Sequence, residues 1–228
     1  MQDESTMMKP FQVTGRRFGY DDVSATFYPF KEFKTTWQRC GSRAELKVTD
    51  YLQNANVDIL GDFADCLFTR IQRHRKEIYT ERLRAWLQSP EFVKRNQPLY
   101  LDRSRNLAYS PQGSNCDLTT LLEGLRDQGL INDGQGAFIC WTNKPNRYRL
   151  GYCSILMKVV AISSALDSPT IPQFVTEYVL YHELLHLENG LESLRSQHDP
   201  AFRRQERRYP RWREAETWLK KVAGQKVS

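Results

Sequence analysis

No stretch of this sequence is apolar over the roughly 18 residues that a membrane-spanning helix needs, and the candidate KVVAISSAL is far shorter. The N-terminus, MQDESTMMKPF, mixes acidic and polar residues and lacks the basic and then apolar layout of a signal peptide. These absences argue against the membrane-spanning and secreted classes. We therefore expect a cytoplasmic protein with no membrane partner.

Paired cysteines are also missing. The five cysteines are widely spaced and odd in number, and no two of them form a Cys-x-x-Cys pair. This spacing argues against a disulfide framework and against a cysteine-based zinc ribbon. We expect reduced, mostly buried thiols. The chain also has no internal repeat, low-complexity tract or Gly/Ser linker, which argues against the repeat and disordered classes.

The apolar content is sufficient for a core, with 40% hydrophobic and 12% aromatic residues in a chain of 228. Apolar periodicity and turn formers predict short strands and helices in irregular alternation, with a loop over residues 97–115. The fold class is therefore α+β, with a small mixed or antiparallel sheet packed against helices. The predicted strands are 23–30, 43–48, 137–141, 147–153 and 158–163, and the predicted helices are 57–74, 79–88, 117–130 and 173–188.

Positive charge is concentrated at the C-terminal end. From Ala201 onward there are nine Lys or Arg and three Asp or Glu, which equals the net charge of +6 of the whole chain. Such a segment can attract DNA, so DNA is a possible partner. The alternative is a solvated helix whose aromatic residues, such as Tyr209 and Trp212, face the protein interior.

Histidine is scarce, yet two of the four histidines stand four residues apart in the segment YVLYHELLHLENG. On a helix, His182 and His186 lie on one face and can both bind one zinc ion. Glu183 lies one residue around the helix, where it can take a proton from a water molecule that zinc activates. This pattern is typical of His-Glu-x-x-His zinc hydrolases, in which zinc lowers the pKa of the water and polarises the scissile carbonyl.

A third ligand is needed, and we predict His198, because neutral imidazole is the commonest metal ligand. Eleven residues separate it from His186, which allows the chain to turn back after Gly190. His74 lies in a charged stretch and is expected to be solvated. Imidazoles also accept manganese, cobalt or iron. Carboxylates are alternative third ligands, and the candidates are Glu192, Asp199, Glu206 and Glu214.

The sequence resembles the SprT-like zinc metallopeptidases. The resemblance rests on FICWTNKPNRYRLGYC, on VVAISSALDSPTIPQFVTEYVLYHELLHL and on HDPAF, and it covers roughly residues 117–210. It implies a small α+β catalytic domain, protein or peptide substrates, a zinc ion held by three histidines, and a glutamate as general base. On the matching positions these are His182, His186, His198 and Glu183. Some relatives cleave proteins that are crosslinked to DNA, but this chain has no cysteine zinc ribbon or separate DNA-binding module.

We therefore predict one domain over residues 1–228. Residues 1–95 provide supporting strands and helices, 96–210 form the SprT-like catalytic region, and 201–228 form a basic C-terminal helix. Substrate is expected to add to a sheet edge, either 147–153 or 158–163. Tyr181, Tyr209 and Arg149 are candidates for stabilising an oxyanion, although structural roles are commoner for these residue types.

Two other functions remain open. The first is a zinc hydrolase that acts on a nucleotide or RNA, although Glu183 and the eleven-residue spacing argue against a three-histidine ribonuclease. The second is a nucleic-acid-binding module with structural zinc, which requires a closed site of four ligands. The scarcity of cysteines near His182 argues against it. The preferred prediction is a zinc-dependent metallopeptidase with Zn²⁺ as its cofactor.

Overall fold

The computed structural model describes residues 4–73, 79–132, 136–191 and 198–224. The chain divides into two compact units, Met1–Tyr100 and Leu101–Ser228, which are described separately. Both contain helices and a three-stranded mixed sheet, so the predicted α+β class is confirmed. Whether the two units act as the single domain that we expected stays a prediction. No helix in the described part of the chain has the length and apolar character to cross a membrane.

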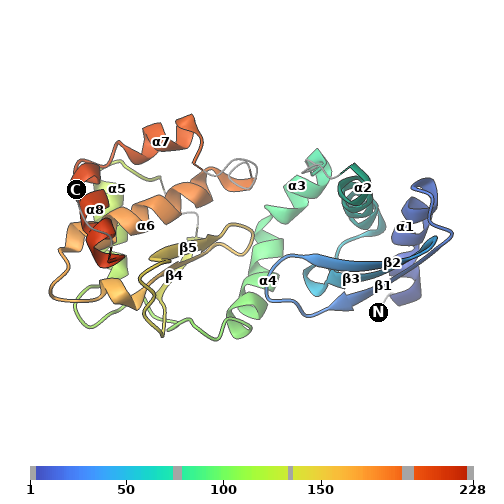
Figure 1. The fold of residues 1–228 in the computed structure, drawn as a ribbon, viewed down its shortest axis with the longest axis horizontal. Helices are drawn as coiled ribbons and strands as arrows, with labels where there is room; N and C mark the ends of the chain where they lie inside the picture. The colour runs from blue at the N-terminus through green and yellow to red at the C-terminus, as the bar shows by residue number, and fades with distance from the viewer. Residues whose placement is uncertain (1–3, 74–78, 133–135, 192–197, 225–228) are drawn as a thin grey trace. The chain divides into compact units, whose positions relative to one another are not determined.

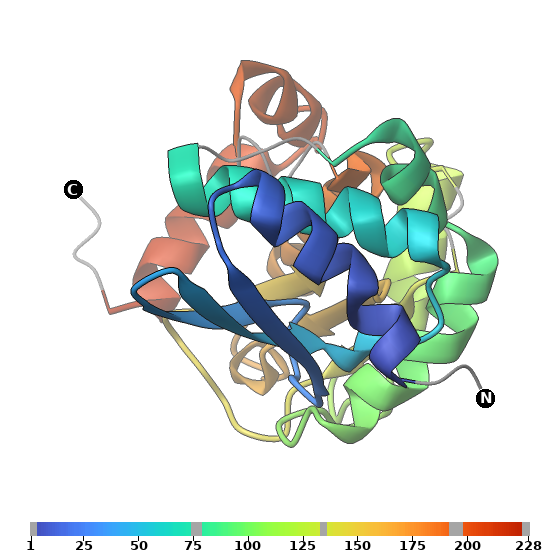
Figure 2. The ribbon, with the colours of Figure 1, turned by 90° about the vertical axis from the view of Figure 1, so that its right-hand side faces the viewer.

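The N-terminal unit contains a sheet in the order β1-β3-β2, in which β3 pairs with β1 in parallel and with β2 antiparallel. Buried and exposed residues alternate along β3, so one face of the sheet is covered. Helices α1 and α2 pack against each other, and α1 also packs on β1 (Figure 2). The elements of this unit are α1 (Glu4–Arg17), β1 (Asp22–Tyr28), β2 (Thr35–Cys40), β3 (Arg43–Thr49), α2 (Val57–Arg73), α3 (Glu81–Leu87) and α4 (Pro90–Asp102).

Most predicted elements of this unit are present. The strands predicted at 23–30 and 43–48 correspond to β1 and β3, and the helix at 57–74 corresponds to α2. The loop predicted over 97–115 is wrong in its first part, because α4 continues to Asp102 with Pro98 inside it. Helix α1 and strand β2 were not predicted, and five of the six residues of β2 are exposed, so its sequence carries no alternating apolar pattern.

The C-terminal unit contains the second sheet, in the order β4-β6-β5, with helix α6 packed against β5 and β6 (Figure 1). Strand β6 pairs with β4 in parallel and with β5 antiparallel, so β5 and β6 form a hairpin. The elements of this unit are α5 (Leu118–Asp127), β4 (Phe138–Trp141), β5 (Gly151–Ser154), β6 (Val159–Ile162), α6 (Gln173–Glu188), α7 (Pro200–Glu206) and α8 (Trp212–Val222).

The two edges of this sheet differ. On the outer side of β4, the backbone of Trp141 exchanges hydrogen bonds with Ala108 and Ser110, so a preceding segment covers this edge. Within the described residues, no strand pairs with β5 on the side away from β6. Because β6 is the central strand, β5 is the edge that remains open for an added strand.

Local signals set the ends of the helices. The Asp117 side chain accepts a hydrogen bond from the Thr119 backbone N–H and caps α5, as expected. Helix α6 ends at Glu188 before Asn189-Gly190, and Gly190 has a φ of +56°. At the start of α6, Pro172 occupies the N-cap position and no side chain caps the helix.

Two helices, α7 and α8, occupy the segment 201–228 in which one basic helix was expected. Pro210 lies between them and lacks the N–H that a continuous helix would use there. Several cationic side chains of this segment lie against aromatic rings of the same unit, including Arg211 over Phe174 at 3.5 Å and Lys221 over Trp218 at 4.9 Å. Phe202 and Tyr209 of this segment are buried in the core of the unit, and Trp212 and Trp218 pack against that core, which agrees with the alternative in which the aromatic residues face the protein.

Candidate metal centre

Helix α6 supplies two imidazoles from one face. His182 and His186 are one helical turn apart, and their Nε2 atoms lie 3.3 Å from each other. The helix is fixed by burial on several sides, since it contacts β5, β6, α5, α7 and α8, and ten of its sixteen residues are buried. It is therefore a central helix of the unit, buried on several sides.

The third imidazole comes from the residue pair that precedes α7. The Nε2 atom of His198 lies 3.1 Å from that of His182, and one ring nitrogen from each histidine lies within 4.8 Å of the others. His198 has a φ of +60°, a left-handed conformation that few residues other than glycine adopt. Backbone strain of this kind persists only where the surrounding structure enforces the conformation, and such residues often lie at functional sites.

The spacing of these nitrogens fits one metal ion. Ligand nitrogens about 2.0–2.1 Å from a tetrahedral zinc ion lie about 3.3 Å apart. The two Nε2–Nε2 distances of 3.3 and 3.1 Å match this value. The predicted histidines are therefore brought together with the same ring atom facing a common point, and His198 keeps one side of the group exposed to solvent.

Glu206 holds the far side of His182. Its Oε1 atom lies 2.7 Å from Nδ1 of the imidazole, and both side chains are largely buried. A carboxylate only accepts hydrogen bonds, so Nδ1 carries the proton and the lone pair of Nε2 faces the other histidines. This arrangement fits the carboxylate–histidine–metal geometry common in metalloproteins. Glu206 had been named as an alternative metal ligand, but the structure places it behind the imidazole of His182, on the side away from the other histidines.

Phe202 packs beneath all three imidazoles. Its ring centroid lies 5.2 Å from that of His182, 4.5 Å from that of His186 and 5.1 Å from that of His198. Helix α7 is positioned for this contact by Asp199, whose side chain caps it by accepting a hydrogen bond from the Phe202 backbone N–H. One buried aromatic ring therefore joins the histidines of α6 to the histidine that precedes α7.

The protein environment favours neutral imidazoles at two positions. Burial, with His182 and His198 nearby, lowers the pKa of His186 to about 4. Burial and His182 also lower the pKa of His198. Burial acts to lower the pKa of His182 as well, but the hydrogen bond to Glu206 and the neighbouring carboxylates raise it above its ordinary value. His186 and His198 are thus neutral at pH 7, the form that binds metal.

Glu183 points toward the sheet rather than into open solvent. Its side chain is 7% exposed, and burial raises the pKa of its carboxyl to about 7, although His182 and Arg149 act to lower it. Gly151 of β5 makes room for it: a Cβ atom there would lie 2.7 Å from Oε1 and 2.8 Å from Cγ of Glu183. No local sequence pattern indicates this contact, because it depends on how β5 packs against α6.

The other named candidates lie elsewhere. Tyr181 donates to the Gln205 carbonyl and Tyr209 donates to Glu177, so both hydroxyls are engaged away from the imidazoles. Glu214 pairs with Arg211 on α8. Arg149 is exposed and lies over the ring of Tyr152, near enough to Glu183 to affect its pKa. The candidate Glu192 and His74, which was expected to be solvated, lie outside the described residues.

Replacing Gly151 by alanine is expected to destabilise the C-terminal unit by about 1–3 kcal/mol, because the new methyl group collides with Glu183 and with Val179 Cγ1, 2.9 Å away. Thermal unfolding followed by circular dichroism measures the effect. The matched control is Gly124→Ala in α5, where the nearest atom is 3.5 Å away and alanine favours the helix. Equal stability of the two variants would show that Glu183 does not pack against β5 in this way.

Comparison with known proteins identifies one similarity. A family model described as the YgjP-like metallopeptidase domain matches residues 140–222, a little over a third of the chain. No curated protein and no solved structure gives a significant match. The matched region contains Glu183 and all three clustered histidines. Residues 140–222 of this chain are thus similar to a metallopeptidase domain, which agrees with the coarser part of the resemblance to SprT-like enzymes.

Proposed function

We propose that this protein is a zinc-dependent metallopeptidase in which His182, His186 and His198 hold the metal and Glu183 is the general base. The single observation that carries the proposal is the convergence of three Nε2 atoms at distances suited to one tetrahedral ion. The similarity of residues 140–222 to a metallopeptidase domain supports peptide hydrolysis as the reaction.

The donor set suits a catalytic zinc ion. Catalytic zinc sites use three protein ligands and leave a fourth position open, whereas structural sites are closed by four ligands. The cluster found among the described residues has three members, one of them exposed. When bound there, zinc would supply Lewis-acid chemistry, activating a water molecule and polarising the peptide carbonyl. This favours a hydrolase over the alternative of a nucleic-acid-binding module with structural zinc.

Glu183 is suited to moving a proton. It neighbours His182 on α6, and burial raises the pKa of its carboxyl to about 7, close to the pH at which a general base works best. Its carboxylate would accept a proton from the attacking water and deliver it to the nitrogen of the leaving amine. Gly151 lets Glu183 lie between α6 and the sheet, so that the base is held against β5 rather than free to rotate.

Strand β5 offers a place for the substrate backbone. The Ser163 N–H donates to the Leu150 carbonyl, so Leu150 faces β6 and the next residue, Gly151, directs its backbone groups to the opposite side. An extended peptide can add there as a further strand, held by main-chain hydrogen bonds. Because Gly151 also contacts Glu183, a peptide on this edge would lie beside the proposed base.

Protein or peptide is therefore the proposed substrate. No feature of the described site specifically favours a nucleotide or RNA substrate. DNA binding through the basic segment rests on the charge of residues from Ala201 onward, and part of that charge is engaged with aromatic rings of the same unit.

Replacing Glu183 by glutamine keeps the shape of the side chain but removes its capacity to accept a proton. We expect one zinc per chain to remain while hydrolysis of casein falls by about 10²–10⁴-fold. Metal analysis and a fluorescent casein assay measure the two quantities. Glu123→Gln, an exposed change on α5, is the matched control and should leave both unchanged. Full activity in Glu183→Gln would remove the general base from the proposal.

Replacing Glu206 by glutamine weakens the hydrogen bond that orients His182, and we expect zinc affinity to fall about 10–100-fold. Competition with a chromogenic chelator measures the affinity directly and needs no enzymatic assay. Glu214→Gln removes a carboxylate of the same unit that pairs with Arg211 on the surface, and it should leave the affinity unchanged. If both variants bind zinc as the wild type does, Glu206 does not support the metal centre.

A further inference from the structure

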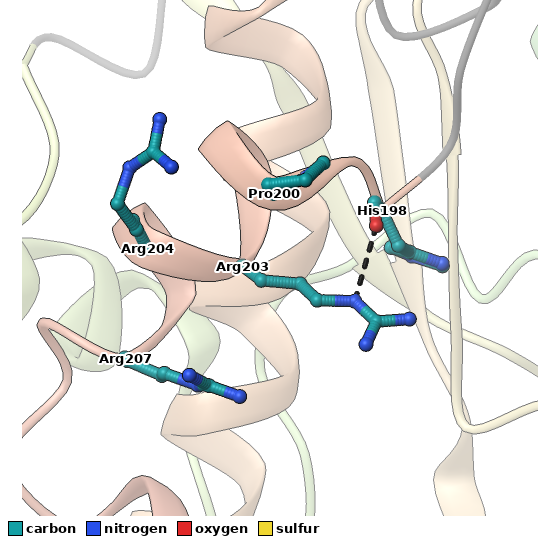
Figure 3. A pocket seen from close by; sticks show the side chains of 5 residues that line it. All are labelled: His198, Pro200, Arg203, Arg204 and Arg207. Atoms are coloured by element: carbon teal, nitrogen blue, oxygen red, sulfur yellow. Dashed lines mark hydrogen bonds between the residues drawn. The ribbon is translucent and has the colours of Figure 1, made fainter.

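Helix α7 has two different faces. The inner face carries Phe202 and Glu206, which contact the imidazoles. The outer face carries Pro200, Arg203 and Arg204, followed by Arg207 at the C-cap. Their spacing of i, i+3, i+4 and i+7 places these four residues on the same side. A pocket of about 520 Å³ lies on this outer face and includes one of the clustered histidines. The residues that line it are His198, Pro200, Arg203, Arg204 and Arg207 (Figure 3).

The pocket carries positive charge, and no carboxylate in the described part of the chain pairs with it. Among the described residues, none of its three arginines forms a salt bridge. The two acids of this segment are engaged elsewhere, Asp199 as the cap of α7 and Glu206 with His182.

Two of the three arginine side chains point to the same side of the pocket. Figure 3 shows the side chains of Arg203 and Arg207 extending to the same side, while Arg204 points away from them. Arg203 is held in place by a hydrogen bond of 3.1 Å from its Nε atom to the His198 carbonyl, which leaves its terminal amino groups to face the pocket. Arg207 is placed by its guanidinium, which lies 5.3 Å from the centre of the Trp212 ring.

We propose that this pocket is a substrate subsite for a carboxylate, the side chain of an aspartate or glutamate close to the bond that is cut. The inference rests on the proposed peptidase function and adds a substrate preference to it. Guanidinium groups bind carboxylates through two parallel hydrogen bonds, which gives both strength and orientation. Because His198 belongs to both the pocket and the imidazole cluster, an anion held here lies beside the reacting bond.

A peptide carboxylate fits this pocket better than a nucleic acid. Binding of nucleic acid depends on many cations distributed along successive phosphates. Here the cationic groups that face the same way are two arginines four residues apart, Arg203 in α7 and Arg207 at the C-cap of that helix. Such a compact pair suits one carboxyl group.

The test compares peptides that differ only in charge. A set of internally quenched peptides carries glutamate at one position flanking the scissile bond, and a matched set carries glutamine there. For one position we expect kcat/KM of the wild-type, zinc-loaded protein to be about tenfold higher with glutamate, the size of effect typical of a hydrogen bond to a charged group. No preference for glutamate at any position would overturn the proposal.

Substitutions at Arg207 test whether the preference for glutamate comes from this pocket. In Arg207→Gln the ratio of kcat/KM for glutamate over glutamine peptides should fall to about one-third or less, and in Arg207→Glu it should invert, with lysine preferred at that position. Lys220→Gln, which removes one exposed positive charge from α8, is the control and should keep the wild-type ratio. A ratio that persists in Arg207→Glu would show that another part of the protein recognises the acid.

A binding experiment separates this proposal from the proposed function. Zinc-loaded Glu183→Gln protein is applied to an array of decapeptides present in glutamate and glutamine versions, with and without a double-stranded DNA competitor. Stronger retention on the glutamate versions, lost in the additional Arg207→Glu change, supports the subsite even if no peptide is hydrolysed. Equal retention of both versions overturns it. So does DNA binding that depends on Arg207 and weakens steeply with salt, without any preference for glutamate.

Discussion

The C-terminal unit is organised around the approach of three imidazole nitrogens to one point. Three neutral ring nitrogens with their lone pairs turned toward each other are unfavourable without a cation between them, and the surrounding structure must hold them. Two are fixed by the helical repeat of α6, and the third is fixed by the turn into α7. The ring of Phe202 and the carboxylate of Glu206 hold the imidazoles from behind, so that packing and hydrogen bonding both define the site.

The fold positions this cluster by burying its main helix. Because α6 contacts a sheet on one side and helices on others, its histidines cannot shift without disturbing the core. The same burial gives Glu183 its raised pKa, and the glycine of β5 allows the carboxyl to lie close to the sheet. Gly151 of β5 lies beside Glu183, and the arginine pocket includes His198. In the function that we propose, an extended substrate would make two kinds of contact, one through its backbone and one through a charged side chain.

The sequence predicted those helices and strands that are marked by patterns among neighbouring residues. The spacing of His182 and His186, followed by Asn189-Gly190, identified α6 and its end, and the alternating pattern of residues 43–48 identified β3. Strand β2 was not predicted, because most of its side chains are exposed and its sequence therefore lacks the alternation of apolar and polar residues that marks a half-buried strand. In the site, the role of Glu206 and the fit of Gly151 against Glu183 depend on contacts between elements far apart in sequence. No periodicity encodes such contacts, so they required the structure.

X-ray absorption at the zinc edge tests the central claim most directly, using the full chain loaded with one equivalent of zinc. Three imidazole nitrogens on one ion predict a first shell of light atoms about 2.0–2.1 Å from zinc, with the outer-shell scattering of three histidine rings. That scattering should fall to the level of two rings in His198→Ala. A sulfur shell at about 2.3 Å, or a spectrum that is the same with and without His198, would contradict the account.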